Sequence, residues 1–419
     1  MKILVVGSGG REHALAWKLK QSSTVDTVYS LPGNGGTKLN LAIDPQDFSA
    51  ILQTVQEQEI DLVVIGPEAP LSEGLTDYLQ QHQIKVFGPT KAGAQLEASK
   101  SWAKELMNSA GIPTAFSETF SDLSSALVYL AQQQAPIVIK ADGLAAGKGV
   151  IVAQTMEEAQ TGLERLFAEG YGHVMVEEFL AGEEVSVLAL TDGKTITPLI
   201  PAQDHKRIGE GDTGENTGGM GVYAPAPIAT PALMKEVTET ILKPTLQALQ
   251  QRGIDYRGVI YAGLMVGSDG KPKVLEFNCR FGDPETQAIL PLLKTPLDQV
   301  LMACATQTLG EHLPLAWHKG HAVCVIAAAG GYPGSYAKGN VIQGLSSVVN
   351  VGAIPFHAGT QEDDQGQILT NGGRVLGITA VGATFQEARN TAYRAMEYVK
   401  FDDIYFRKDI GWRVLARES

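Results

Sequence analysis

The sequence predicts a mixed α/β and α+β fold in three parts: a Rossmann-like N-terminal domain, a central domain with antiparallel strands, and a small C-terminal α+β domain. In the first hundred residues, apolar strand patterns alternate with amphipathic helical patterns, which is typical of a parallel sheet. In the middle of the chain, short turns join neighbouring strand patterns, as in β-hairpins. The last hundred residues contain two strand patterns and a helix, which predict a separate small domain.

Composition limits the classes of partner. The 419 residues are enough for about two to four domains, and 44% hydrophobic with 19% charged residues describes an ordinary globular protein. A net charge of −13 argues against a nucleic-acid or anionic-membrane partner, because such partners bind basic surfaces. We therefore expect any anionic ligand to be held by local lysines, arginines and backbone amides.

The cysteines and the hydropathy predict a cytoplasmic protein. Cys279, Cys304 and Cys324 are odd in number and widely spaced, which excludes a disulfide framework or a zinc ribbon and fits a reducing compartment. The first residues, MKILVVGSGGREH, show a strand pattern in place of a signal peptide. No apolar run approaches the ~20 residues of a membrane span.

The N-terminal part is predicted to bind a ligand where its first strand meets its first helix. Gly7, Gly9 and Gly10 lie at this junction, where amide N–H groups and the helix dipole attract anions. A dinucleotide fold requires a third glycine where Glu12 stands, and an acid about twenty residues further on that is absent here. A phosphorylated sugar therefore fits better than NAD, and a tight turn without a ligand is the alternative. Strand patterns occur at residues 3–6, 25–30, 61–66 and 85–88, and helical patterns at 13–20, 48–58 and 75–82.

Two groups of glutamates are candidates for contacts with ribose and adenine. Glu68 follows the strand pattern at 61–66, at the carboxyl edge where open α/β sheets bind ligands, and its carboxylate can accept hydrogen bonds from ribose hydroxyls. In VMVEEFLAGEEVSV, the backbone near Glu177 and Glu178 can contact an adenine edge while Glu184 accepts ribose hydroxyls. Solvent-exposed loop carboxylates are the alternative for each.

The stretch IVIKADGLAAGKGVIV, residues 137–152, combines glycines and lysines between two β-branched runs. It is not a P-loop, because only three residues separate Gly143 from Gly147 and Lys148, and Gly149 follows where Ser or Thr is required. Both flanking runs have strand character, so the stretch is predicted to be a β-hairpin with a flexible tip. A helical pattern precedes it at 99–111 and another follows at 155–170.

Residues 204–223, DHKRIGEGDTGENTGGMGVY, show no periodicity and are expected to be a long loop, which in a compact domain is either functional or disordered. A helical pattern at 232–250 follows, and then a hairpin of two strands with its turn at 268–271.

The second strand of that hairpin contains the motif EFNCRFGDPE. Glu276 and Asn278 share one face, and their oxygens suit Mg²⁺, which binds few protein oxygens beside substrate phosphates. Arg280 supplies a planar fork for carboxylate or phosphate. Cys279 lies on the other face and is interpreted as a small buried residue. Polar alternation on an exposed strand is the alternative for Glu276 and Asn278.

With these segments in this order, the sequence resembles the ATP-grasp superfamily and, within it, the phosphoribosylamine–glycine ligase family, also called glycinamide ribonucleotide synthetases. The resemblance covers nearly the whole chain. It rests on VGSGGREHALAWKL, PGNGGT, IGPEAPL, VFGPT, LEASK, IVIKADGLAAGKGV, EEFLAGEE, QDHKRIGEGDTGENTGGMG, EFNCRFGDPETQ, AAAGGYPG, FHAGT, TNGGRVL and RKDIGW.

The resemblance implies a domain arrangement and an activity. The domains are 1–100, which binds 5-phosphoribosylamine, a two-part ATP-grasp domain at 101–315 with an ATP lid subdomain at about 112–190, and 316–419. The implied activity joins glycine to 5-phosphoribosylamine through glycyl phosphate, giving glycinamide ribonucleotide, ADP and phosphate in de novo purine (IMP) biosynthesis. ATP is a co-substrate and Mg²⁺ or Mn²⁺ the metal. The implied partners are these small molecules only, with no nucleic acid or membrane, and the enzyme is expected to be a monomer.

The resemblance also implies site residues. Glu276 and Asn278 are the implied metal ligands, and Arg280, Asp204 and Asp283 are the implied catalytic residues facing glycine or its acyl phosphate. The implied sugar-phosphate site consists of Gly9, Gly10, Asn34 and Glu68. The implied ATP site consists of Lys100, Lys140, Gly143, Gly147, Lys148, Gly149, Glu177, Glu178, Phe179 and Glu184.

Two departures and three rival functions accompany the resemblance. The family commonly has a longer insertion before the strand that begins near Val174, and many ATP-grasp enzymes have an acid where this chain reads YAGLMV, so a second metal site is left open. The rivals are another ATP-grasp ligase or a carboxylase, an NAD-dependent oxidoreductase, and a nucleotide sensor without catalysis. Glu12 disfavours the oxidoreductase, and the presence of Glu276 and Asn278 disfavours the sensor.

Overall fold

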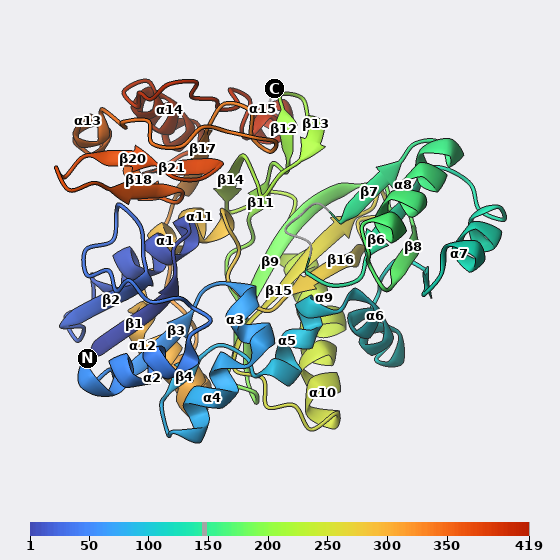
Figure 1. Cartoon of the computed structure of the whole chain (residues 1–419), viewed down its shortest axis with the longest axis horizontal. Coiled ribbons are helices and arrows are strands. Elements are labelled where there is room, and N and C mark those ends of the chain that lie inside the picture. The colour runs from blue at the N-terminus through green and yellow to red at the C-terminus, as the bar shows by residue number, and fades with distance from the viewer. Residues whose placement is uncertain (145–148, 419) are drawn as a thin grey trace.

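The computed structural model of the chain describes residues 1–144 and 149–418. Its N-terminal part is a parallel four-stranded sheet of order β2-β1-β3-β4, flanked by helices (Figure 1). The strand–helix alternation of the sequence is therefore confirmed, although the sequence patterns did not predict α3 and α5. The elements are β1 (Lys2–Gly7), α1 (Gly10–Leu19), β2 (Thr27–Pro32), α2 (Phe48–Glu57), β3 (Leu62–Ile65), α3 (Glu68–Glu73), α4 (Leu75–Gln81), β4 (Val86–Phe87) and α5 (Lys91–Ala98).

The central sheet is antiparallel, with order β10-β9-β15-β16. Its hairpin of β15 and β16 confirms the two strands and the turn that the sequence predicted. A bulge between Gly263 and Leu264 interrupts this pairing next to Glu276. The elements are α6 (Lys100–Ser109), β9 (Glu183–Thr191), β10 (Ile196–Pro198), α9 (Pro231–Val237), the π-helical η1 (Thr238–Leu242), α10 (Lys243–Gln251), β15 (Gly258–Val266) and β16 (Pro272–Asn278).

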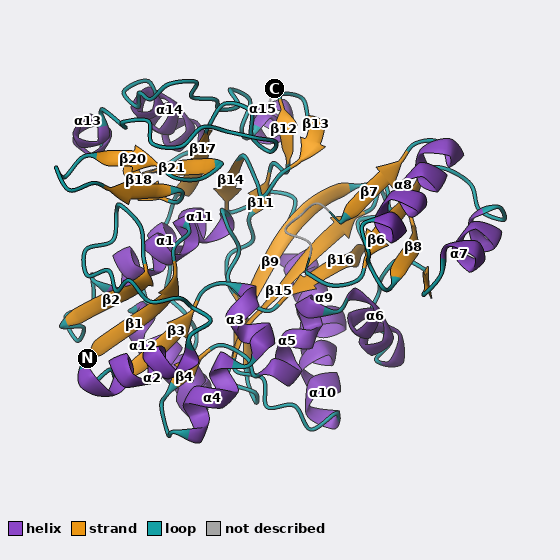
Figure 2. Ribbon diagram, viewed as in Figure 1, coloured by secondary structure: helices purple, strands orange, loops and turns teal. Residues whose placement is uncertain are grey.

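A smaller antiparallel sheet, which we call the lid sheet, has the order β5-β8-β6-β7. The predicted hairpin of residues 137–152 forms its β6 and β7. Figure 2 shows this sheet and its two helices beside the central sheet. The elements are β5 (Ser117–Phe120), α7 (Leu123–Leu130), β6 (Ile137–Ala141), β7 (Val150–Ala153), α8 (Met156–Ala168) and β8 (Val174–Glu178).

One expected boundary of this lid sheet is wrong. β9 pairs with β15 in the central sheet, so the lid sheet ends before the expected residue 190. The chain crosses between the sheets near Gly182, whose backbone packs so closely that a Cβ there would lie 2.2 Å from the Val266 carbonyl oxygen. Strand patterns alone do not show which sheet a strand joins.

The C-terminal sheet has the order β11-β14-β17-β21-β18 and takes two of its strands from the middle of the chain. The expected long loop at 204–223 is therefore wrong, because this region contains β11, β14 and a two-stranded ribbon of β12 and β13. These strands have only two to four residues, too few to show a period in the sequence. The elements are β11 (Gln203–Asp204), β12 (Arg207–Gly209), β13 (Thr213–Asn216), β14 (Gly221–Ala224), β17 (His321–Ala328), α13 (Leu345–Asn350), β18 (Ile354–His357), β19 (Thr360–Glu362), β20 (Ile368–Thr370), β21 (Arg374–Gly382), α14 (Phe385–Met396) and α15 (Trp412–Glu418).

The N-terminal and C-terminal sheets are joined through helix α11 and its neighbours. α1 packs against α11, and also against β18 and α12. Asn34 donates hydrogen bonds to the carbonyls of Ser8 and His357, at 2.9 and 2.8 Å, and so connects the two domains. The remaining helices are α11 (Glu285–Leu292), α12 (Leu297–Thr306) and the 3-10 helix η2 (Leu309–His312). Within the described residues, no helix has the length and apolar character needed to cross a bilayer.

Candidate active site

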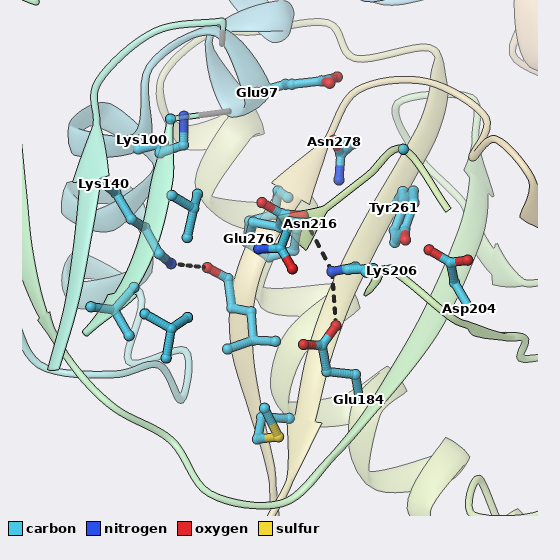
Figure 3. Close-up of a pocket in the computed structure, with 18 of the residues that line it drawn as sticks. Glu97, Lys100, Lys140, Glu184, Asp204, Lys206, Asn216, Tyr261, Glu276 and Asn278 are labelled. Carbon is cyan, nitrogen blue, oxygen red and sulfur yellow. Dashed lines mark hydrogen bonds and ion pairs between the residues drawn. The ribbon is translucent and has the colours of Figure 1, made fainter. Parts of the chain in front are cut away.

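The three domains and the lid sheet surround one cavity of about 700 Å³. Polar side chains reach it from α6, the lid sheet, the central sheet, the ribbon and the C-terminal sheet (Figure 3). Figure 3 shows Lys140 on the lid side and Lys206 on the other side of Glu276. The charged residues that line it include Arg11, Glu68, Glu97, Lys100, Lys104, Lys140, Glu177, Glu184, Asp204, Lys206, Glu276, Arg280, Asp283, Arg374 and Arg413.

The lid side of the cavity is a buried cluster of two lysines on one glutamate. Glu177 forms ion pairs with both Lys104 and Lys140, and the three side chains are 2%, 7% and 8% exposed. Lys140 also donates a hydrogen bond to the Leu275 carbonyl at 3.1 Å. Burial lowers the pKa of Lys104, although Glu177 opposes that shift. The cluster keeps one positive charge in excess.

Lys100 adds a third ammonium group near the base of the lid hairpin. Its Nζ donates to the Gly143 carbonyl at 2.8 Å, and its backbone N–H donates to Asp142 Oδ1 at 2.6 Å. Asp142 thus accepts from the first turn of α6, where the positive end of the helix dipole favours a carboxylate. Gly143 has φ +110°, a conformation that glycine adopts readily. The hairpin and α6 therefore meet at the cavity.

The opposite side of the cavity is a half-exposed cluster of two glutamates on one lysine. Lys206 Nζ lies 2.8 Å from Glu184 Oε2 and 3.8 Å from Glu276 Oε1. Burial opposes the charge of Lys206, but these two carboxylates raise its pKa well above the ordinary value. Burial likewise opposes the ionisation of Glu276, yet Lys206 and Lys140 lower its pKa. Glu276 is therefore a carboxylate at neutral pH.

Arg280 connects strand β16 with the N-terminal part of the chain. It forms ion pairs with Glu97 at 2.9 Å and with Glu68 at 3.3 Å, and it donates to Asn278 Oδ1 at 3.0 Å. Burial disfavours the charge of Arg280, but the two glutamates raise its pKa. Cys279 is buried and its thiol contacts Glu97, and burial raises its pKa well above the usual range, so it is no nucleophile.

An acidic corner lies beside Arg374. Burial and the neighbouring Glu285 raise the pKa of Asp204 well above its usual value. Asp283 is partly buried, which opposes its ionisation, but its ion pair with Arg374 at 3.2 Å lowers its pKa. Glu285 accepts hydrogen bonds from Tyr261 at 2.6 Å and from Ser186 at 3.0 Å. All three carboxyl groups line the cavity.

Of the four residues predicted to bind the sugar phosphate, only one lines the cavity in the structure. Glu68 lines the cavity, whereas Gly9, Gly10 and Asn34 lie behind it, where the N-terminal and C-terminal domains meet. The Gly9 N–H donates to Glu12 Oε2 at 2.6 Å, so a side chain of this protein already occupies part of the α1 N-terminus. A Cβ on Gly10 would lie 2.5 Å from the Gln287 amide nitrogen.

Most other predicted site residues meet at the cavity. Gly143, Gly149, Glu177, Glu178, Phe179, Glu184, Asp204, Glu276, Asn278, Arg280 and Asp283 line it, as do Lys100 and Lys140. Gly147 and Lys148, predicted for the lid, lie outside the described residues.

Sequence reasoning did not single out Glu97, Lys104, Lys206 and Arg374, although they line the same cavity. Three of them stand in the motifs LEASK, DHKR and TNGGRVL.

Glu276 and Asn278 suit a divalent metal only in part. They offer one carboxylate and one amide oxygen, a hard donor set that matches Mg²⁺ when substrate phosphates complete the shell. Among residues 1–144 and 149–418, no group of three or more His, Cys, Asp or Glu side chains forms a metal site on its own. The donor chemistry therefore fits a metal that arrives with a phosphate ligand.

Two antiparallel sheets that line one charged cavity, in a segment that matches an ATP-grasp domain model, place the chain in the ATP-grasp class of enzymes. Sequence models of phosphoribosylglycinamide synthetase match the chain at residues 1–97 for the N domain, 98–286 for the ATP-grasp (A) domain and 322–413 for the C domain. The chain belongs to the phosphoribosylglycinamide synthetase family.

Individual relatives agree with this family. The chain is 61% identical to phosphoribosylamine–glycine ligase of Synechocystis sp. over 99% of this chain and 100% of that protein. It is 48% identical to the Escherichia coli K12 ligase, with both chains fully covered. The crystal structure of the Thermotoga maritima ligase matches with a TM-score of 0.84 at 35% identity, over 98% of this chain and 100% of that chain. The biotin carboxylase domain of Hydrogenobacter thermophilus 2-oxoglutarate carboxylase, at 16% identity, a TM-score of 0.72 and coverage of 97% and 91%, shares the fold.

Proposed function

We propose that this chain joins glycine to 5-phosphoribosylamine at the expense of ATP, giving glycinamide ribonucleotide, ADP and phosphate, a step of de novo purine biosynthesis. The observation that carries the proposal is the cavity, where lysines face carboxylates between the three domains. Full-length similarity to phosphoribosylamine–glycine ligases supports the choice of substrates. We also propose that it acts on these small molecules as a cytoplasmic monomer.

The first step proposed is phosphoryl transfer to the glycine carboxylate. A free carboxylate is a poor acylating agent, and glycyl phosphate has a good leaving group. Lys100 and Lys140, which line the cavity, are proposed to hold the ATP phosphates, and Glu276 with Asn278 would hold Mg²⁺ or Mn²⁺. The metal, when bound, would neutralise and orient phosphate oxygens. The side chains thus act mainly by positioning and charge neutralisation.

The second step is attack of the phosphoribosylamine amino group on glycyl phosphate, which releases phosphate and forms the amide. The acidic corner of Asp204 and Asp283 is proposed to face the ammonium group of glycine, because both carboxyl groups line the cavity and Arg374 lowers the pKa of Asp283 against the opposing effect of burial. Ion pairs with Glu68 and Glu97 fix the position of the Arg280 guanidinium. Arg280 can therefore orient Asn278 and Glu68. A closed lid would keep water away from the acyl phosphate.

The sugar phosphate is proposed to lie on the N-terminal side of the cavity. Glu68 is a third exposed there, and Arg280 and Arg11 lower its pKa against the opposing effect of burial, so it is a carboxylate suited to ribose hydroxyls. Gly9, Gly10 and Asn34 shape the turn behind it. Because Glu12 accepts the Gly9 N–H, a phosphate at this turn would require other N–H groups.

The adenosine is proposed to lie at the segment after β8. Glu178 and Phe179 line the cavity there, and Glu184 offers a half-exposed carboxylate to ribose hydroxyls. Glu177 faces Lys104 and Lys140 with its side chain, so any contact with adenine would come from its backbone. Gly147 and Lys148, which lie outside the described residues, are proposed to contact the phosphates.

The runner-up is another ATP-grasp ligase or a carboxylase, because the biotin carboxylase domain shares the fold. An assay of ADP release decides between them. The purified chain is given ATP and magnesium with glycine, with freshly generated phosphoribosylamine, with both, or with bicarbonate alone. We expect turnover only when glycine and phosphoribosylamine are both present. ADP release with bicarbonate and without glycine would overturn the proposal.

A further inference from the structure

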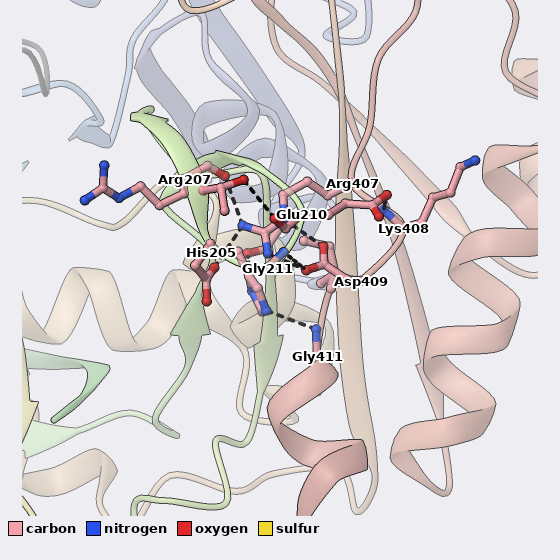
Figure 4. A network of polar contacts seen from close by, with 12 residues as sticks. His205, Arg207, Glu210, Gly211, Arg407, Lys408, Asp409 and Gly411 are labelled. Atoms are coloured by element: carbon pink, nitrogen blue, oxygen red, sulfur yellow. Dashed lines mark hydrogen bonds and ion pairs between the residues drawn. The ribbon is translucent and has the colours of Figure 1, made fainter.

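The motif RKDIGW, residues 407–412, lies far from the ATP-binding strands in the sequence but meets the ribbon of β12 and β13 in space (Figure 4). We propose that Arg407 is a positioning residue that holds the ribbon so that Lys206 stays between Glu184 and Glu276. This inference rests on the proposed function, since it concerns turnover at the same cavity.

Both chain neighbours of Lys206 are bound to the motif. Arg407 Nη1 donates to the Arg207 carbonyl at 3.0 Å, on one side of Lys206. On the other side, the Gly411 N–H donates to His205 Nε2 at 3.1 Å, so Nδ1 of that ring carries the proton and faces the Gly221 carbonyl at 3.3 Å. The side chain of His205 before Lys206 and the backbone of Arg207 after it are thereby held by one segment of the C-terminal domain.

The far end of the ribbon is bound to the same segment. Arg407 is fully buried, and its fork donates to both oxygens of Asp409, at 2.8 and 2.7 Å. Its Nη1 also contacts Asp212 at 3.0 Å. Asp409 in turn accepts the Gly211 N–H at 2.8 Å. A bidentate, charge-assisted contact of this kind is directional, so it fixes an orientation as well as a distance.

Polar contacts are the main attachment of this ribbon. The strands β12 and β13 are half-buried and exposed, and none of residues 207–216 belongs to the hydrophobic core. The carbonyl of Lys206 accepts from Thr217 through its N–H at 2.7 Å and its hydroxyl at 2.8 Å, which ties Lys206 to the ribbon. Movement of the ribbon would therefore move Lys206 and its ammonium group.

The chain offers a matched control on the same segment. Arg389, on α14, donates to the carbonyls of Ile410 and Lys408 at 3.0 and 2.9 Å, so it holds the motif without standing between the motif and the ribbon. Arg407→Lys keeps the charge but removes the fork, and Arg389→Lys makes the same chemical change.

The first test compares the kcat for ADP release and the thermal midpoint of these two variants. We expect Arg407→Lys to lower kcat by about 10- to 100-fold, because a shift of about 1 Å in Lys206 would disturb Glu276, the proposed metal ligand, with a much smaller change in KM for ATP. Arg389→Lys should keep kcat near the wild-type value. Equal kcat in the two variants, at similar thermal midpoints, would show that Arg407 only stabilises the fold. If Arg407→Lys does not fold, Asp409→Asn weakens the same contact and has the same expected result.

The second test asks whether Arg407 acts through Lys206. In a double-mutant cycle, Lys206→Met should itself lower kcat, and Arg407→Lys added to it should lower kcat little further. Fully additive losses would refute the proposal. If wild-type turnover does not depend on glycine, the proposed function fails, but the cycle can still be measured on whatever ATP-consuming turnover the wild type shows.

Discussion

Each side of the cavity contains a cluster of three charged side chains. The two clusters have opposite composition and differ in burial. On the lid side, two lysines share Glu177, and all three side chains are at most 8% exposed. On the other side, two glutamates share Lys206, and these side chains are 32% to 45% exposed. The first cluster has an excess of positive charge and the second an excess of negative charge.

This difference matches the two tasks that we propose for the cavity. Positive charge on the lid side would attract phosphates, and negative charge around Glu276 would attract a divalent cation, as phosphoryl transfer requires. A buried cluster cannot lose one partner without leaving an uncompensated charge in a dry environment. A half-exposed cluster can exchange its partners for water or ligand at little cost. The lid side therefore keeps its contacts, whereas the other side can admit a ligand while the residues on both sides of Lys206 stay fixed.

The largest expected effect is a loss of turnover when Glu276, in the cluster around Lys206, is replaced. Glu276→Ala removes one of the two proposed metal ligands, so we expect turnover to fall by more than the roughly 100-fold that loss of an outer-shell partner can cost. The thermal midpoint should change little, because Glu276 is 37% exposed. ADP release at saturating magnesium measures the first effect, and thermal unfolding the second.

Glu239→Ala is the matched control for this experiment. Glu239 is an exposed carboxylate that pairs with Lys243 at 2.6 Å on the helix surface. It should leave turnover unchanged. Ordinary turnover in Glu276→Ala at ordinary magnesium would refute the metal assignment.

The second prediction concerns the buried cluster. Glu177→Gln leaves Lys104 and Lys140 without their carboxylate, and breaking a buried ion pair costs about 3–5 kcal/mol of unfolding free energy. Denaturant unfolding of the variant and the wild type measures the difference. A loss below about 1 kcal/mol, the value typical of a surface pair, would mean that the cluster is hydrated and that the contrast between the two sides is false.

Local patterns predicted the strands that carry the site, but the sequence could not assign strands to sheets. The hairpin of β6 and β7 and the hairpin of β15 and β16 follow from short turns between apolar runs, and both are confirmed. β9 looked like a continuation of the lid because it follows β8 closely, yet it pairs with β15. Pairing partners distant in sequence leave no trace in periodicity.

The shared position of two side chains was predictable where both lie on one strand, as Glu276 and Asn278 do, and both line the cavity. The site was not predictable where a side chain contacts residues that are distant in the sequence. Glu177 was expected beside adenosine, and only the fold shows its side chain between Lys104 and Lys140. Lys206 stands in a region without periodicity, and its partners lie on β9 and β16.

A third prediction uses acid to disturb the side of the cavity that holds Lys206. Burial, with Arg407 and Arg413, lowers the pKa of His205 to about 4. The unfolded chain therefore binds a proton first, so stability is greatest above the ordinary pKa of about 6.5 and is lost as pH falls towards 4. We expect His205 to contribute a loss of about 2 kcal/mol at pH 5, measured by denaturant unfolding.

Two further histidines act in the same direction, and a variant separates them from His205. Burial lowers the pKa of His13 to about 3 and that of His357 to about 4, where the N-terminal and C-terminal domains meet. His205→Asn should reduce the slope of stability against pH while the contribution of these two remains. An unchanged slope would show that His205 is not the neutral acceptor of the Gly411 N–H.

The smallest effect expected is that of Lys206→Met on stability. Lys206 and its two partners are each about a third or more exposed, so water can replace the ammonium group, and the loss of unfolding free energy should stay below about 1 kcal/mol. Glu184 and Glu276 would then repel each other with less compensation, which raises the attraction of the site for a divalent cation. The variant should therefore be stabilised more than the wild type by added magnesium in thermal unfolding. If Lys206→Met lost as much unfolding free energy as Glu177→Gln, the two clusters would contribute equally to stability. The distinction between the two sides of the cavity would then be false.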